Sequence, residues 1–526
     1  MEFSDVDYRD IQGLVRFAHA HLPEARFRVL EIADSAAARA WITSVADRVT
    51  HAHAGDKPKR ALQIAFTCEA LASLGVPLAM LAAFSLEFRK GMPERNRARR
   101  LGDVKDNAPA EWQWGAKESA AYVLIMTYAE TDKLGGWESE LEGPHWKAAF
   151  HHPGRDLRAT RTDDLEPFGF VDGVSQPAID WDQHNSARLR TTTEYTNLSA
   201  VGEFVLGYPN EYGRYTDRPL VDAHDARAAV LPLAEDQPGM CDFGRNGTFL
   251  VLRDLEQDID GFNDFVAKNA PAGAPQGRKL RAKMSGRVPA DIPLNPPWPS
   301  GAPPQDPNKG HFPQGRPPWR DPYAHDNPNE LLPAGAPITP IGDAPIDGVG
   351  PHLKDIWLDQ FTFKKDADGA ACPYGAHIRR ANPRNADLPE GTSGFFQRVL
   401  RILGFGSRHP HDDLISSTRF HRIIRRGRAH PKGLYFVCLN ANIARQFEFV
   451  QASWIANAKF NGVDEDDPLL GVRAPLFSGA AVDTFTQRED SGIPCRIRGL
   501  PQFVTMRGGA YFFLPGIRAL RYIAGG

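Results

Sequence analysis

The sequence has few cysteines and no cysteine motif. Cys68, Cys241, Cys372, Cys438 and Cys495 lie far apart, are odd in number and form no CxxC pair. Disulfide frameworks and zinc knuckles both need closely spaced, paired cysteines. The pattern therefore argues against both kinds of site, and we expect reduced thiols, as in a cytoplasmic protein.

A membrane span, an export signal and an excess of one charge are also missing. No apolar run reaches the about 18 residues that a transmembrane helix needs. The first seven residues, MEFSDVD, are acidic and lack the basic and apolar regions of a signal peptide and the twin-arginine pair. The formal net charge of -3 gives no general attraction to nucleic acids or anionic membranes. We therefore expect a cytoplasmic protein without a nucleic-acid or membrane partner.

The remaining composition is that of a globular protein. Of the 526 residues, 42% are hydrophobic and 24% are charged, and this length allows two or three ordinary domains. One segment differs, because residues 271–351 are rich in proline and glycine and show a helical pattern only around 278–284. A packed core cannot be built from most of this segment, so we interpret it as a long surface insertion.

Apolar periodicity predicts strands and helices in both parts of the chain. In the first part, residues 10–17, 60–67 and 120–128 have strand-like patterns, and residues 36–49 have a helical composition. The charged run at 89–100 is most simply a solvated face. This order of elements indicates an α+β module with helices on one face of a sheet.

The second part repeats this alternation of elements. We expect strands at 247–253 and 433–439, a strand pair at 502–506 and 510–514 turned by Gly508-Gly509, and helices at 254–268, 441–456 and 516–523. Asn440 stands where it can cap the second of these helices.

Asp172 lies between two glycines in the stretch GFVDGVSQP. Apolar neighbours surround this carboxylate, and glycines permit backbone angles and close approaches that other residues forbid. A partly desolvated acid on such a turn suits a group that passes protons near neutral pH. The alternative is a turn aspartate that caps its own backbone, and the stretch alone favours that alternative.

Four stretches of the second part carry more information when they are read together. They are GFVDGVSQP at 169–177, CPYGAHIRRANPR at 372–384, FHRIIRRGR at 420–428 and GLYFVCLNANIARQFEFVQASW at 433–454. In this order and at these separations they resemble the dye-decolorizing peroxidases, which are haem enzymes. The length and the long insertions are similar to those of the long-chain subgroup, and the resemblance extends over nearly the whole chain.

The resemblance implies an α+β fold of two ferredoxin-like modules of the dimeric α+β barrel type. Each module is then an antiparallel sheet with helices packed outside. We place the N-terminal module at 1–165 and the C-terminal, haem-binding module at 166–526, with the proline- and glycine-rich insertion at about 271–351. The implied cofactor is haem b, iron protoporphyrin IX.

The resemblance also assigns roles where the motifs match. His377 aligns with the proximal iron ligand, a role that suits a neutral imidazole. Asp172 aligns with the distal acid–base group and Arg425 with the distal arginine, although the adjacent Arg426 stays open as an alternative. Leu434 and Phe436 share one face of a strand and align with residues that cover the distal side of the haem.

Two further assignments stay open. Arg379, Arg380 and Arg384 are candidates for contacts with the haem propionates, with surface salt bridges as the alternative. The carboxylate that orients the proximal histidine is not identified by the motifs; Glu448 and Asp387 are candidates.

The resemblance implies a haem peroxidase that uses hydrogen peroxide to oxidise phenolic or dye-like aromatic donors through an oxyferryl intermediate. A haem-handling protein, which stores haem or removes its iron, is one alternative. A non-catalytic interaction protein whose 271–351 segment binds a partner is another. The joint presence of Asp172, His377 and Arg425 favours the peroxidase, while the natural reducing substrate and a homo-oligomeric state stay open.

Overall fold

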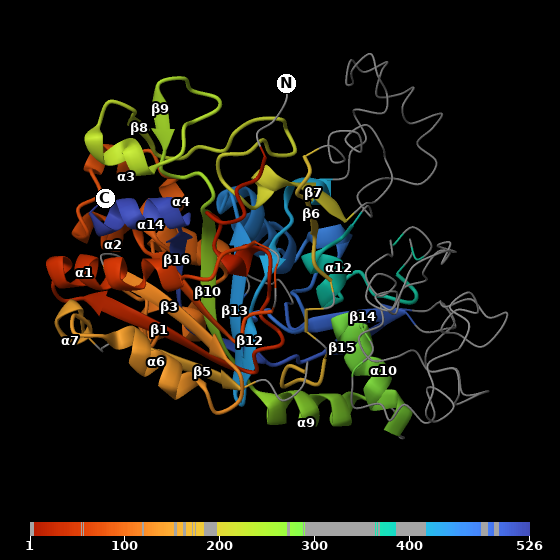
Figure 1. Cartoon of the computed structure of the whole chain (residues 1–526). Helices are drawn as coiled ribbons and strands as arrows, with labels where there is room; N and C mark the ends of the chain where they lie inside the picture. Colours follow the sequence, from red (N-terminus) through yellow and green to blue (C-terminus); the bar gives the residue numbers. More distant parts are fainter. Residues whose placement is uncertain are drawn as a thin grey trace, which may run out of the picture.

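A large sheet runs through both parts of the chain in the computed structural model (Figure 1). Its hydrogen-bonded order is β11-β13-β10-β16-β2-β3-β1-β4, with β12 beside β13 and β5 beside β1. Every pairing in this sheet is antiparallel. The structure describes residues 5–53, 55, 57–117, 120–151, 155–160, 165–170, 172–173, 175–183, 197–270, 274–287, 289, 363, 366, 369–384, 417–474, 482–488 and 494–525.

The strands of this sheet come from the two ends of the chain. They are β1 (Glu24–Ile32), β2 (Arg60–Phe66), β3 (Tyr122–Ala129), β4 (Phe150–His151), β5 (Asp156–Thr160), β10 (Thr248–Gln257), β11 (Ile424–Arg425), β12 (Arg428–His430), β13 (Gly433–Asn440) and β16 (Val504–Leu514). The N-terminal and C-terminal strands meet between β2 and β16, where Phe66 is the partner of Phe513. Smaller pairs are β6 (Ala178–Asp180) with β7 (Leu198–Ala200), β8 (Leu220–Asp222) with β9 (Met240–Asp242), and β14 (Thr484–Arg488) with β15 (Pro494–Arg498).

Helices lie on both sides of the central strands. On the left of Figure 1 are α1 (Ser35–Val45), α6 (Leu134–Glu142) and α7 (Trp146–Ala149), and above the strands are α2 (Cys68–Ser73), α3 (Leu78–Ala82), α4 (Leu86–Lys90) and α14 (Ile517–Ala524). On the right and below are α9 (Ile259–Asn269), α10 (Ala274–Ser285) and α12 (His377–Ala381). Further helices are α5 (Arg95–Leu101) and the π-helical segments η12 (Ala444–Glu448) and η13 (Val450–Ile455).

Alternation of side chains separates two core clusters on the two faces of the large sheet. Along β10, Phe249 and Val251 belong to one cluster and Leu250 and Leu252 to the other, because successive strand residues point to opposite faces. The second cluster also holds the rings of Phe27 on β1 and Tyr435 on β13, with centroids 6.1 Å apart. The sheet therefore curls until its outer strands approach each other, although hydrogen bonds do not close it into a barrel within the described residues.

The α+β class and the antiparallel sheet with helices outside are confirmed. The predicted strands at 60–67, 120–128, 247–253 and 433–439 appear as β2, β3, β10 and β13. The predicted helices at 36–49 and 516–523 and the helical pattern around 278–284 correspond to α1, α14 and α10. The two-module division at residue 165 stays a prediction.

Several local predictions are wrong. Residues 502–514 do not form a hairpin, because β16 continues through Gly508-Gly509 beside β10. Residues 254–257 extend β10 before α9 begins. The amide of Arg445 receives its side-chain cap from Asn442, whereas Asn440 ends β13. The run at 10–17 contains a short 3-10 helix, and β1 was not predicted.

Two buried ion pairs connect the N-terminal part to the C-terminal part. Arg97 of α5 pairs with Glu448 of η12, which also accepts a hydrogen bond of 2.9 Å from the hydroxyl of Tyr511. Asp103, which follows α5, pairs with Arg253 of β10. Since Arg97 is only 7% exposed, the charged run at 89–100 is not entirely a solvated face as predicted.

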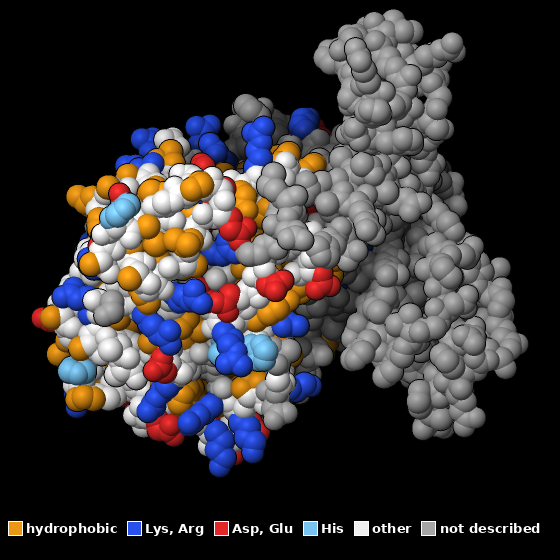
Figure 2. All heavy atoms as spheres, turned by 45° about the horizontal axis from the view of Figure 1, so that its top comes forward, with side chains coloured by type: hydrophobic (Ala, Val, Ile, Leu, Met, Phe, Trp, Pro, Cys, Tyr) orange, Lys and Arg blue, Asp and Glu red, His pale blue; other side chains and the backbone are white. Residues whose placement is uncertain are grey.

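The outer surface has a mixed character. On the face shown in Figure 2, basic and acidic side chains are interspersed with apolar ones. Among the described residues, none of the helices has the length and apolarity that crossing a bilayer requires.

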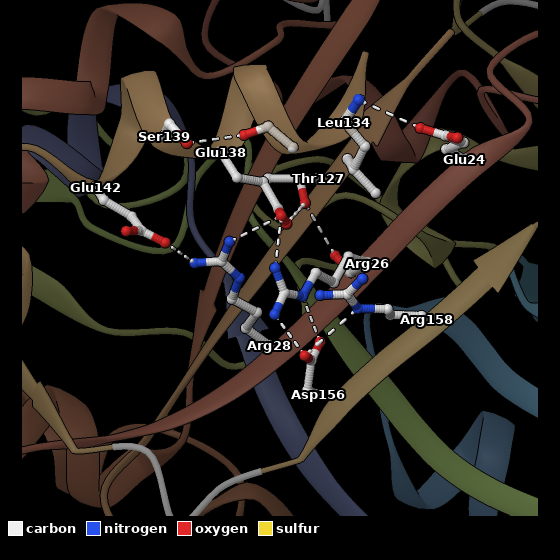
Figure 3. A network of polar contacts seen from close by, with 11 residues as sticks. Glu24, Arg26, Arg28, Thr127, Leu134, Glu138, Ser139, Glu142, Asp156 and Arg158 are labelled. Atoms are coloured by element: carbon white, nitrogen blue, oxygen red, sulfur yellow. Dashed lines mark hydrogen bonds and ion pairs between the residues drawn. The ribbon is translucent and has the colours of Figure 1, made fainter. Parts of the chain in front are cut away.

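A polar network fastens α6 and β5 to β1 (Figure 3). The buried carboxylate of Glu138 accepts from Arg26 at 2.6 Å, from Arg28 at 2.9 Å and from the hydroxyl of Thr127 at 2.9 Å. Arg26 also pairs with Asp156 on β5. Glu138 therefore bridges two guanidinium groups and joins a helix to two strands.

We predict that Glu138→Gln lowers the free energy of unfolding by about 1–3 kcal/mol, because both guanidinium groups lose a buried charged acceptor while Asp156 and Glu142 remain as their other carboxylate partners. Denaturation with urea at neutral pH measures this change. Glu140 lies on the same helix as Glu138 and forms an exposed pair with Arg60 of β2. Glu140→Gln is therefore the matched control and should change stability by about 0–1 kcal/mol. Equal effects of the two substitutions would contradict the prediction.

Candidate active site

A cavity of about 290 Å³ contains five of the six predicted site residues, namely Asp172, His377, Arg425, Leu434 and Phe436. The wall combines side chains from the sheet, from the segment before β6, from α12 and from the π-helical segments. Its apolar lining includes Phe168, Phe170, Leu255, Ile378, Phe447, Val450, Trp454, Ile455, Leu469, Leu470 and Val504. Large apolar surfaces with a few convergent polar groups are typical of cofactor and ligand sites.

The sheet forms the floor of this cavity. On β10 the residues Arg253, Leu255 and Gln257 line it, and they continue the face that carries Phe249 and Val251 in the core. The register pairs Arg253 with Phe436 and Leu255 with Leu434 on β13. Leu434 and Phe436 are therefore side by side with the β10 residues, as the period of two predicts.

His377 opens α12 and carries a hydrogen-bonded imidazole. Its Nδ1 lies 2.9 Å from Oδ2 of Asp467, and since a carboxylate only accepts, Nδ1 donates in this contact; in a neutral imidazole the lone pair is then on Nε2. Asp467 is fully buried, and its Oδ1 accepts from the amides of Leu469 and Leu470. Burial acts to raise the pKa of Asp467, but His377 and Arg380 outweigh it and the pKa falls below its usual value. This is the arrangement of a metal-ligating histidine with a carboxylate behind it.

Sequence reasoning missed Asp467. Glu448 is instead engaged by Arg97 and Tyr511, and Asp387 lies outside the described residues. The signal that was available is the acidic run 464–467, but four adjacent carboxylates in an irregular segment gave no way to select one of them.

Asp172 and Arg425 meet at another part of the wall. Nη1 of Arg425 lies 3.2 Å from Oδ1 of Asp172. The side chain of Arg425 is 35% exposed and that of Asp172 is 29% exposed. The amide of Gly173 also donates to this oxygen, at 2.7 Å. Gln176 and Ser175 hold the arginine, because they accept from its amide at 2.9 Å and from its Nη2 at 3.2 Å. The pair therefore brings a carboxylate and a fixed cation together beside the cavity.

The structure separates Arg425 from Arg426. Arg426 does not line the cavity; it donates from Nε to the carbonyl of Leu14 at 2.8 Å and from Nη2 to that of Val15 at 3.0 Å. Burial lowers its pKa to about 10. Arg425 is therefore the member of the pair that faces the site. Arg426, which directly follows β11, binds the N-terminal segment at Leu14 and Val15.

Gly427 owes its identity to packing against the neighbouring strand. A Cβ at this position would lie 2.6 Å from the carbonyl oxygen of Tyr435. Only glycine allows this close approach of the two strands.

Arg379 does not line the cavity. Its Nη1 donates to the carbonyl of Cys372 at 2.7 Å and to Asp366 at 3.2 Å, and its guanidinium lies 4.6 Å from the ring centroid of Phe363. The prediction that Arg379 binds the cofactor therefore has no support from the geometry. Arg380 likewise donates to backbone carbonyls, including that of Asn457 at 3.0 Å.

Arg384 is the arginine of this stretch that reaches the cavity. It lies on the cavity wall and donates from Nη2 to the hydroxyl of Ser175 at 2.9 Å. It therefore connects the segment after α12 to the segment that carries Asp172.

The sequence and the fold were compared with those of known proteins. No protein-family model matches the chain. A dye-decolorizing peroxidase of Exidia glandulosa is 25% identical over 98% of this chain and 87% of its own length, and dye-decolorizing peroxidase AauDyP1 of Auricularia auricula-judae is 24% identical over 97% and 86%. The chain is a relative of the dye-decolorizing peroxidases. The crystal structure of a fungal DyP-type peroxidase from Auricularia auricula-judae shares the fold, with a TM-score of 0.66 at 22% identity and coverage of 99% and 100%.

The residues of the cavity fit the haem on which dye-decolorizing peroxidases depend. His377 lines the cavity, and with Nδ1 bonded to Asp467 its Nε2 is the nitrogen that suits haem iron. The broad apolar lining suits a porphyrin, and Arg384 offers a cation to its carboxylates. The donor set of this relative of the dye-decolorizing peroxidases therefore agrees with the cofactor.

Asp466, next to the histidine's partner, generates a prediction about pH. It is 6% exposed, and burial raises its pKa to about 6 even though Arg473 and Arg380 oppose the shift. Well below pH 4 the acid is protonated in both folded and unfolded states. Between about pH 4 and pH 6 the unfolded state ionises while the folded state keeps its proton, so stability falls over this range, and above about pH 6 the folded state holds a disfavoured charge.

We therefore expect Asp466→Asn to stabilise the fold at pH 7–8 by up to about 3 kcal/mol and to have little effect near pH 4. Urea denaturation of both proteins across this pH range measures the difference. Asp464→Asn, at an exposed position of the same segment, is the control. A gain that is equal at both ends of the range would contradict the assignment.

Proposed function

We propose that the chain is a haem peroxidase that binds haem b in this cavity and uses hydrogen peroxide to oxidise phenolic or dye-like aromatic donors. The observation that carries the proposal is the presence, around one cavity, of the His377–Asp467 pair and the Asp172–Arg425 pair. The first pair suits an iron ligand and the second suits proton transfer beside a developing negative charge. Relationship to the dye-decolorizing peroxidases supports the same reaction class.

His377 is proposed to hold the iron through Nε2. Asp467 keeps the proton on Nδ1, fixes the ring orientation and makes the imidazole more basic. Leu434, Phe436 and Leu255 would lie against the porphyrin, since they form the apolar floor of the cavity. When bound, haem supplies the redox chemistry that side chains lack.

Asp172 is proposed to move the peroxide proton. Its carboxylate would take a proton from one oxygen of hydrogen peroxide and return it to the other, which would leave as water. The two electrons that this cleavage of the oxygen–oxygen bond needs are the chemistry that bound haem would supply. Arg425 stabilises the negative charge that develops as the oxygen–oxygen bond breaks, because its guanidinium is held in place before the reaction. The intermediate that the family resemblance implies stays a prediction.

The haem-handling alternative needs the same ligand but makes no use of Asp172 and Arg425. The interaction-protein alternative depends on 271–351, most of which lies outside the described residues. A Soret band together with peroxide-dependent oxidation of an artificial donor would separate the peroxidase from both. The cytoplasm stays the predicted compartment, no nucleic-acid or membrane partner is predicted, and a homo-oligomer stays open.

His377→Ala should lose haem as well as activity, because it removes the only protein bond that we assign to the iron. The ratio of Soret to protein absorbance after purification measures haem content. His224→Ala, with a side chain that is 94% exposed, is the matched control and should keep both. Full haem content and an unchanged Soret spectrum in His377→Ala would overturn the ligand assignment.

Asp172→Asn and Arg425→Leu should keep haem but react slowly with peroxide. Loss of a positioned acid–base group typically costs about a hundredfold to ten-thousandfold in rate. Loss of a preorganised charge costs roughly 3–4 kcal/mol, or about a hundredfold to a thousandfold. Stopped-flow absorbance measures the reaction of each haem-loaded variant. Wild-type rates in both variants would refute the proposed roles.

A further inference from the structure

Glu166 is a carboxylate on the cavity wall to which the proposed reaction gives no role. It lies six residues before Asp172 in the chain. Its Oε1 accepts from the amide of Phe170 at 3.0 Å, and its Oε2 accepts from the amide of Phe168 at 3.1 Å and from Nε2 of Gln257 at 2.5 Å. Three donors therefore converge on one side chain.

The backbone closes the same turn. The amide of Glu166 donates to the carbonyl of Phe170 at 3.0 Å, and the amide of Gly169 donates to the carbonyl of Glu166 at 2.8 Å. Gly169 has a φ of +89°, which a residue with a side chain rarely adopts. The segment 166–170 is thus a tight turn with the Glu166 carboxylate bound across it.

Both ends of this turn are anchored. Phe168 and Phe170 belong to a buried cluster, in which the ring of Phe168 lies 4.6 Å from that of Phe262 on α9. Gln257 belongs to β10 and lines the cavity floor. The Glu166–Gln257 hydrogen bond therefore ties the turn to the sheet that also carries Leu255 and Arg253.

The charge of Asp172 acts on Glu166. The pKa of Glu166 lies above its usual value. Burial is the largest cause and the Asp172 charge acts in the same direction, whereas the hydrogen bonds from Gln257, Phe170 and Phe168 act against the shift. Since its oxygens are already engaged by three donors, Glu166 is better suited to holding the backbone than to exchanging protons with a ligand.

We propose that Glu166 is a positioning residue that fixes the approach of Asp172 to the cavity by binding the 166–170 turn to Gln257. The proposal rests on the proposed function, in which Asp172 moves the peroxide proton. Displacement of a reacting group by about 1 Å can cost about a hundredfold in rate, so release of this turn should slow the reaction without removing haem.

The test is a double-mutant cycle of Glu166→Gln with Asp172→Asn, measured as the rate of the haem-loaded proteins with hydrogen peroxide. Glutamine has the shape of glutamate, but its amide nitrogen cannot accept from a backbone N–H. We expect Glu166→Gln to lower the rate by about tenfold to a hundredfold when Asp172 is present. In the Asp172→Asn background it should change the rate by less than about threefold, because a residue that acts through a lost group has little left to influence. Equal losses in both backgrounds would overturn the proposal.

A second measurement does not depend on activity. Hydrogen exchange of the Phe168 and Phe170 amides should be faster in Glu166→Gln than in wild type, with or without haem, and unchanged in Glu140→Gln, which removes an exposed glutamate charge on α6. Unchanged exchange in Glu166→Gln would overturn the proposal. If the wild-type protein does not react with peroxide, the proposed function fails, while the exchange result still decides whether Glu166 holds the turn.

Gln257→Leu keeps the test decisive if Glu166→Gln does not fold. It removes one of the three donors from the side of the sheet and leaves the turn amides in place. We expect the same direction of change in rate and in exchange, with a smaller size, and again almost no effect on rate in the Asp172→Asn background. A loss of the same size in both backgrounds would contradict the proposal.

Discussion

The alternation of side chains along β10 is the constraint on which the site depends. One face of this strand begins in the core with Phe249 and Val251 and continues into the cavity with Arg253, Leu255 and Gln257. Pairing with β13 then fixes where Leu434 and Phe436 stand. A slip of one residue would turn every one of these side chains to the opposite face, so the same hydrogen bonds that hold the sheet also hold the cavity floor.

Buried and half-buried arginines hold the segments around this floor in place. Arg379, Arg380 and Arg426 each donate to backbone carbonyls, and each is next to or close to a proposed site residue in the sequence. A guanidinium has five donors in a rigid plane, which allows one side chain to satisfy several carbonyls of an irregular segment. Of the adjacent pair 425–426, the first arginine lines the cavity and the second binds the carbonyls of Leu14 and Val15.

The sequence predicted the elements with a strong apolar period and failed where tertiary contacts decide. β2, β3, β10 and β13 were predicted because they are buried runs. The hairpin prediction at 502–514 failed because Gly508-Gly509 has the local chemistry of a turn, while pairing with β10 keeps the chain extended through it. Asp172, His377 and Arg425 were found through a family resemblance, whereas Asp467 and the separate roles of Arg425 and Arg426 depend on distances that no motif encodes.

The ion pairs between the two parts of the chain limit how this protein can be divided. Asp103 neutralises Arg253 on the cavity floor, and Arg97 neutralises Glu448 in the π-helical segment that forms another wall. A fragment that began after residue 165 would leave both charges without these counter-ions. Chimaeras with related chains would accordingly need to exchange α5 and its following loop together with β10 and η12. The segments that must be exchanged together therefore come from both halves of the chain.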